Sequence, residues 1–219
     1  MNIDVISDVV CPWCFIGKRH LESALAAWRK EHPGEEQPLV RWHPFQLNPQ
    51  LPRSGVPRAE YIATKFGGPQ RAKEIYARVA NAGARAGIAF NFDGITVQPN
   101  TLNAHRLIHR AGPDGRQDAM AEALFRAYFL EGADLSSDDT LADIAARAGF
   151  DRNEISAYLA GDQDKALIDD QDQHARSLGV EGVPFFIFNR RHAVSGAQPP
   201  ETILEVMEKA QEELAAAPQ

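Results

Sequence analysis

The fold of this chain is best predicted from residues 3–14, which are Ile3-Asp4-Val5-Ile6-Ser7-Asp8-Val9-Val10-Cys11-Pro12-Trp13-Cys14. Residues 3–7 alternate apolar and polar side chains, which is typical of a short strand. Pro12 then stands where proline is favoured, at the first position of a helix. The stretch therefore predicts a strand that leads through a turn into a helix, with both cysteines near the turn.

Cys11 and Cys14 are the only two cysteines in the sequence. A spacing of three residues on a helix brings two Cβ atoms to about 5–6 Å, within adjusting distance of disulfide geometry. Cys11 precedes the helix, so its sulfur lies near unsatisfied N–H groups and the positive end of the helix dipole, which favour the thiolate. Cys14 lies one turn further in, and we expect it to keep a more ordinary pKa. The pair predicts thiol chemistry in which Cys11 attacks and Cys14 resolves.

Both ends of the chain carry strand patterns. Apolar residues recur at helical spacing from Pro12 until Pro33-Gly34, and residues 39–43 then alternate up to a proline. Near the other end, residues 184–188 form an apolar strand, and a turn connects it to a second strand at about residues 192–195. A final helix follows. The chain therefore opens as β-α-β and closes with two strands and a helix.

The middle of the chain differs, because its caps, prolines and glycines all indicate helices. The most economical interpretation is an α/β fold that is interrupted by a large insertion. We predict a small discontinuous α/β domain of residues 1–47 and 164–219, and an all-helical insertion domain of residues 48–163.

Composition limits the function. Of the 219 residues, 44% are hydrophobic and 24% are charged, as in ordinary globular proteins, and the formal net charge is −7. This charge gives no electrostatic reason to bind nucleic acid or anionic lipid. No run of about 18 apolar residues predicts a membrane span. The N-terminus does not resemble a secretory signal, so we expect a cytoplasmic protein, where a lone close cysteine pair indicates redox or metal chemistry.

Further motifs accompany the cysteines in a recognisable order. They are Ser7-Asp8 before Cys11-Pro12-Trp13-Cys14, then Phe45-Gln46-Leu47-Asn48-Pro49, Asn100-Thr101 with Ala104-His105-Arg106-Leu107, Gly182-Val183-Pro184-Phe185-Phe186, and Ser195-Gly196-Ala197-Gln198. In these motifs the sequence resembles the DsbA-like branch of the thioredoxin superfamily, and most closely its FrnE-like cytoplasmic members. The resemblance spans nearly the whole chain.

The resemblance implies a thioredoxin fold with a helical insertion, and protein thiol-disulfide exchange as the activity. It implies that Cys11 is the nucleophile, that Cys14 is the resolving thiol, and that a cis proline at Pro184 faces them. A cis proline at a strand start leaves the backbone of Val183 free, so an extended substrate segment could pair with it as an added strand. We also expect Pro12 and Trp13, which lie between the cysteines, to contact substrate.

Trp13 bears on the direction of the reaction. Periplasmic DsbA enzymes carry a histidine between their cysteines that can donate to the thiolate, whereas an indole offers only its N–H. We therefore predict a reduction potential displaced from the DsbA value of about −120 mV toward the thioredoxin value of about −270 mV. In the cytosol such a pair rests largely reduced, which favours isomerase or reductase work on protein substrates. Glutathione is a candidate reductant, and no other cofactor and no metal is expected.

Other functions compete with this one. Kappa-type glutathione transferases and 2-hydroxychromene-2-carboxylate isomerases share the fold, but they typically carry serine at the position of Cys11 and do not need a dithiol. A holdase that shields unfolded chains would not need the sulfurs either. Structural thiols or a zinc site are further alternatives, although zinc needs about four ligands and no second Cys-x-x-Cys exists. The oligomeric state stays open, with a homodimer among the options.

Some neighbouring residues have an ordinary structural interpretation. His105 and His109 are four residues apart and could share a metal, but an ordinary helix face explains them better. We assign Phe15 to the core, and Lys18 and Arg19 to a solvated helix face rather than to a role near the sulfurs.

Overall fold

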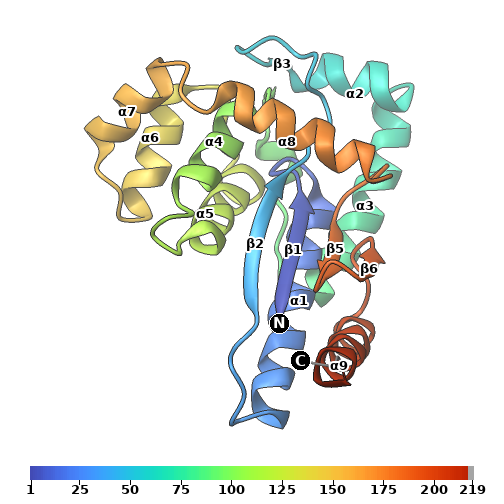
Figure 1. The fold of residues 1–219 in the computed structure, drawn as a ribbon. Helices are drawn as coiled ribbons and strands as arrows, with labels where there is room; N and C mark the ends of the chain where they lie inside the picture. Colours follow the sequence, from blue (N-terminus) through green and yellow to red (C-terminus); the bar gives the residue numbers. More distant parts are fainter. Residues whose placement is uncertain (217–219) are drawn as a thin grey trace.

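The computed structural model describes residues 1–216, and its centre is a four-stranded mixed sheet (Figure 1). Its strands are β1 (Asn2–Ser7), β2 (Leu39–Pro44), β5 (Phe185–Phe188) and β6 (His192–Ser195), in the order β2-β1-β5-β6. The β1–β2 pair is parallel, and the β1–β5 and β5–β6 pairs are antiparallel. Segments from opposite ends of the sequence thus meet in one sheet, as the strand patterns predict.

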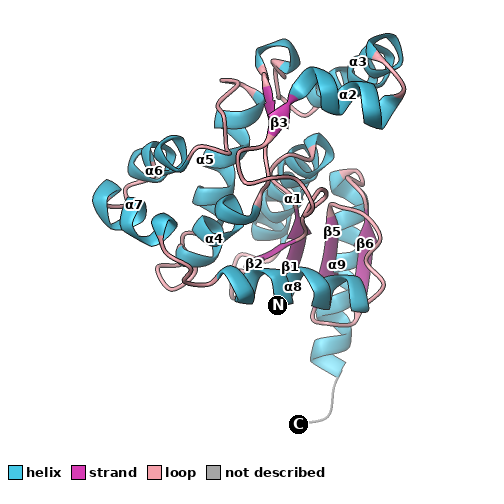
Figure 2. Cartoon of the chain, turned by 90° about the horizontal axis from the view of Figure 1, so that it is seen from above, coloured by secondary structure: helices cyan, strands magenta, loops and turns pink. Residues whose placement is uncertain are grey.

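Helices lie on both faces of this sheet. α1 (Pro12–Glu31) makes the crossover that the parallel β1–β2 pair requires, and α9 (Pro200–Ala216) packs beside it. α8 (Lys165–Ser177) lies on the opposite face (Figure 2). Alternation along the strands directs the buried side chains of Val5, Phe186 and Phe188 to the face that α1 and α9 cover.

The segment between β2 and α8 is mostly helical. Its helices are α2 (Arg58–Phe66), α3 (Pro69–Arg85), α4 (Leu102–Arg110), α5 (Gln117–Phe129), α6 (Asp138–Arg147) and α7 (Arg152–Ala160), with a short 3-10 turn, η1 (Phe92–Gly94). The prediction of an α/β chain with a helical insertion is confirmed. The insertion also contains a two-stranded ladder of β3 (Val56–Pro57) and β4 (Val97–Gln98), so it is not all-helical. Strands of two residues are too short to show an alternating pattern.

A continuous apolar core joins the insertion to the sheet. Phe15 of α1 is fully buried, as predicted, and stacks on Phe125 of α5 with ring centroids 5.1 Å apart. Phe129 adds a second stacked contact to Phe15 at 6.2 Å. The division into domains at residues 47/48 and 163/164 stays a prediction. The apolar core is continuous across both of these boundaries.

Lys18 corrects the expectation of a solvated helix face on α1. Its side chain is only 2% exposed, and its Nζ lies 3.1 Å from Asp118 and 3.2 Å from Glu122, both on α5. Arg19 also pairs with Glu122. These ion pairs tie α1 to the insertion, and the sequence did not predict them because their partners lie about 100 positions away.

Candidate active site

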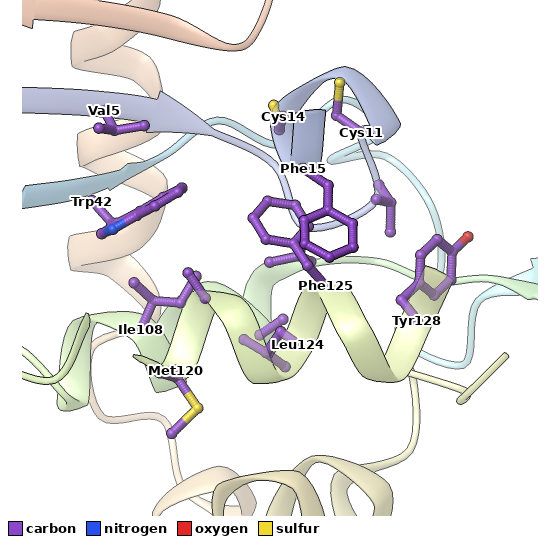
Figure 3. Close-up of a cluster of buried hydrophobic side chains, with 14 of the residues drawn as sticks. Val5, Cys11, Cys14, Phe15, Trp42, Ile108, Met120, Leu124, Phe125 and Tyr128 are labelled. Carbon is purple, nitrogen blue, oxygen red and sulfur yellow. The ribbon is translucent and has the colours of Figure 1, made fainter. Parts of the chain in front are cut away.

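Cys11 occupies the position that caps the N-terminus of α1. Its backbone is extended, with φ −92° and ψ 112°, and Pro12 begins the helix. The N–H of Cys11 donates to the carbonyl of Asp8 at 3.0 Å, and the N–H of Cys14 donates to the carbonyl of Cys11 at 3.0 Å. Figure 3 shows both cysteines at this turn, above the aromatic rings of the core. Cys11 thus stands at the N-terminal end of α1, where the positive end of the helix dipole lies.

The two thiols differ in environment. Cys11 is 6% exposed, whereas Cys14 is 1% exposed. Burial, and secondarily the hydrogen bond with Cys11, raises the pKa of Cys14 well above its ordinary value. The expectation of an ordinary pKa for Cys14 is therefore wrong, because the second thiol of the motif is almost fully buried. In this structure Cys14 is a free thiol.

The loop before β5 faces the first sulfur. The bond between Val183 and Pro184 is cis, and the thiol of Cys11 donates to the carbonyl of Val183 at 3.5 Å. Among residues 1–216, the N–H of Val183 has no hydrogen-bond partner. Pro184 is buried against α1, because a Cβ placed on Gly17 would lie 2.8 Å from its Cγ. The predicted site residues Cys11, Val183 and Pro184 therefore meet.

The residues between the cysteines form the rim of this site. Trp13 is 42% exposed, and Pro12 is half-buried. An exposed indole next to the less buried sulfur offers an apolar surface to an incoming chain. The substrate contacts of Pro12, Trp13 and Val183 stay predictions. Pro12 and Trp13 follow Cys11 in the chain, and the carbonyl of Val183 accepts from the Cys11 thiol.

A buried polar pair lies beneath the turn. The carboxylate of Asp8 is fully buried, and its Oδ2 accepts from the N–H of Leu47 at 2.8 Å. Its Oδ1 lies 3.3 Å from Nε2 of the buried His105, yet neither of these atoms has a hydrogen-bond partner in the described chain. Both residues lie in the motifs quoted above, but only the fold brings them together. Nε2 of His105 therefore faces the carboxylate of Asp8.

Comparison with known proteins identifies the family. The sequence model of one protein family, the DSBA-like thioredoxin domain, matches residues 2–208 of this chain. The chain belongs to this family. The probable DsbA oxidoreductase SCO1869 from Streptomyces coelicolor is 30% identical, with a TM-score of 0.87 over 97% of this chain and 91% of that one. YwbO, an uncharacterized protein from Bacillus subtilis (strain 168), is 27% identical over 85% of this chain and 86% of its own length.

A 2-hydroxychromene-2-carboxylate isomerase shares the fold with a TM-score of 0.72, over the whole length of both chains, at 16% identity. At that identity the likeness concerns the fold alone. Cys11 and Cys14 give this chain the Cys-x-x-Cys pair that thiol-disulfide oxidoreductases of the DsbA-like family use. None of the helices within residues 1–216 combines the length and hydropathy needed to cross a membrane.

Proposed function

We propose that this DsbA-like protein is a cytoplasmic, FrnE-like reductase or isomerase of protein disulfides. The observation that carries the proposal is the placement of Cys11 at the start of α1, 3.5 Å from the carbonyl of Val183, with Cys14 buried behind it. One sulfur meets the substrate, and the other can be reached only from within the site. The FrnE-like motifs support the cytoplasmic assignment.

The reaction proceeds by two exchanges. The thiolate of Cys11 attacks a substrate disulfide, forms a mixed disulfide, and displaces the second substrate sulfur as a thiolate, which takes a proton from solvent. The sulfur of Cys14 attacks the sulfur of Cys11, and the first substrate sulfur leaves as a thiol that has taken the proton of Cys14. The substrate has then gained two electrons, and Cys11 and Cys14 are joined in a disulfide. A thiol reductant of the glutathione class restores the dithiol by the reverse chemistry.

Isomerisation uses the same first step. A substrate thiol, instead of Cys14, attacks the mixed disulfide and closes a different substrate disulfide, so that the enzyme ends as it began. The high pKa of Cys14 favours this outcome, because a protonated thiol leaves the mixed disulfide time to rearrange.

Substrate binding follows from the loop at Val183. Its free N–H and the exposed ring of Trp13 suit an extended, apolar segment without a fixed sequence. We propose that Val183 pairs with the substrate backbone, that Pro184 holds this loop against α1, and that Pro12 and Trp13 contact the substrate side chains.

The test compares insulin reduction by the intact protein, Cys11→Ser and Cys14→Ser. We expect Cys11→Ser to abolish turnover, and Cys14→Ser to stop it after a single exchange. A second arm assays glutathione conjugation and chromene isomerisation. Insulin reduction that persists in Cys11→Ser would contradict the proposed function. Glutathione conjugation or chromene isomerisation that survives in Cys14→Ser would favour a glutathione-dependent enzyme of small molecules instead.

A further inference from the structure

The face of the sheet that α8 covers is only partly closed. In Figure 1, α8 crosses near the end of β1, and the other half of the strands has no helix in front of it. A cavity of about 650 Å³ lies there, bounded by all four strands and α8. The register places Arg41, Asp4, Ile187 and Ala193 side by side in one row across this face.

The floor of this groove is apolar. Ile6 is buried, whereas Phe185 and Ile187 are only half-buried. Leu178, just after α8, is 59% exposed on the groove wall. Apolar side chains on a sheet face are normally covered by other parts of the protein. The face that α8 leaves open therefore keeps exposed apolar area that a ligand could bury.

The charges around the floor are mainly positive. Arg41, Arg190 and Arg191 line the groove, and none of the three has an ion-pair partner among residues 1–216. Asp4 is the one carboxylate in the lining, and its Oδ1 lies 2.8 Å from Nε2 of His43. Three guanidinium groups against one carboxylate leave a charge of +2, in a chain whose net charge is −7.

The remaining titratable groups do not offset this charge. His192 is engaged by Glu213 of α9 at 3.0 Å, and His174 is an exposed residue of α8. The pKa of Asp4 is lowered, first by its hydrogen bond with His43 and further by the nearby charges of Arg41 and Arg190. Arg41 and Arg190 therefore both lie near Asp4, and Arg191 lines the same groove.

We propose that this groove binds a free amphipathic carboxylate, whose alkyl chain lies on Phe185 and Ile187 and whose carboxylate meets the arginines. A guanidinium donates two parallel hydrogen bonds to a carboxylate, and the cavity falls within the roughly 300–1,000 Å³ typical of small-molecule sites. The site is separate from the dithiol, because α1 lies on the other face of the sheet. It does not depend on the proposed exchange activity.

The test uses sodium decanoate, below its micelle concentration, as the probe in amide chemical-shift titrations of the full chain. We expect saturable shifts confined to β1, β2, β5, β6 and α8, unchanged in Cys11→Ser. Decanamide, which lacks the charge, should bind at least about tenfold more weakly, as expected when a hydrogen bond to a charged group is lost. Acetate keeps the charge but buries no alkyl chain, so it should also bind at least about tenfold more weakly.

The matched variants are Arg41→Gln with Arg191→Gln, both exposed, and the control Arg71→Gln on α3. We expect the double variant to weaken decanoate binding at least about tenfold while its spectrum stays dispersed, and the control to bind like the intact protein. Shifts that do not saturate, shifts elsewhere in the fold, or equal losses in both variants would overturn the proposal. Binding to anionic lipid vesicles but not to free decanoate would overturn it too.

Discussion

Cys11 and Cys14 belong to one motif, but burial gives them different chemistry. Cys11 keeps some solvent contact beside Val183, whereas the pKa of Cys14 is raised by burial. We predict that iodoacetamide modifies Cys11 first and that Cys14 reacts slowly even in Cys11→Ser. Peptide mass spectrometry over a time course measures the order. Equal rates in the folded protein would contradict the assignment of roles.

Trp13 places a neutral indole between the two cysteines, and we infer that this residue affects the reduction potential of the pair. A histidine at this position can hydrogen-bond to the Cys11 thiolate and stabilise the reduced form, so Trp13→His should move the reduction potential toward the value of DsbA, about −120 mV. Equilibration with glutathione buffers measures the potential of both proteins. Trp13→Phe is the control, since it keeps an aromatic ring at the rim. A potential that is unchanged in Trp13→His would show that this ring does not control the thiolate.

At the scale of elements, α1 depends on a glycine in its interior. A Cβ on Gly17 would lie 2.8 Å from Cγ of Pro184 and 3.1 Å from Cζ of Phe186. Alanine normally favours a helix over glycine by about 1 kcal/mol, but overpacking costs about 1–3 kcal/mol. We therefore predict that Gly17→Ala lowers the free energy of unfolding and slows insulin reduction. Gly34→Ala, which meets no neighbour, is the control, and a stabilised Gly17→Ala would contradict this packing.

The ion pairs between α1 and α5 make stability depend on pH. Burial raises the pKa of Glu122, but the hydrogen bond with Arg19 and the charge of Lys18 outweigh it, so that the pKa is lowered. A carboxylate with a lowered pKa stabilises the fold above its ordinary value of 4.5, and this contribution is lost as the pH falls through the folded pKa. We predict that Glu122→Gln is destabilised at pH 7 and that its deficit shrinks below about pH 4.

Urea unfolding of both proteins across this pH range measures the effect. Glu131→Gln is the control, because Glu131 forms a surface pair with Arg147 in which both side chains are about half-exposed. A deficit of Glu122→Gln that does not change with pH would mean that the loss comes from packing rather than from charge.

Sequence patterns predict a helix or strand well when neighbouring residues determine where it begins and ends. The alternation of β1, Pro12 at the start of α1 and the apolar run of β5 each identify an element and place Cys11 at a helix start. Contacts between distant segments leave no such pattern. From the sequence alone, Gly17 is expected only to weaken its helix, and the structure is needed to show that Pro184 packs against it. Lys18 is likewise expected to be a solvent-exposed cation, and the structure is needed to show its ion pair with Asp118.

The same limit applies to the site. Cys11 and Cys14 can be found from their spacing and from the helix they begin, whereas the place of Val183 and Pro184 came from the family resemblance. Asp8 and His105 are separated by nearly a hundred positions, so their pairing depends on how α4 packs on the turn. The groove on the α8 face of the sheet cannot be predicted from the sequence either, because it exists only where α8 stops covering the strands.

At the scale of the whole molecule, the insertion and the sheet share one core. Phe15 stacks on Phe125 and Phe129, and Lys18 pairs with Asp118, so both apolar contacts and ion pairs cross the predicted domain boundary. We predict a single cooperative unfolding transition, seen alike by far-UV circular dichroism and by the fluorescence of the buried Trp28 and Trp42. Two separate transitions would contradict a shared core.

The order of the two sulfurs is tested most directly by trapping the mixed disulfide. Cys14→Ser is expressed in cells and acid-quenched, and the protein joined to it by a disulfide is located by peptide mass spectrometry. We predict adducts with several proteins, all at Cys11, and no adducts in the double variant that also carries Cys11→Ser. An absence of adducts from Cys14→Ser, or adducts that contain glutathione alone, would show that Cys11 does not attack protein disulfides.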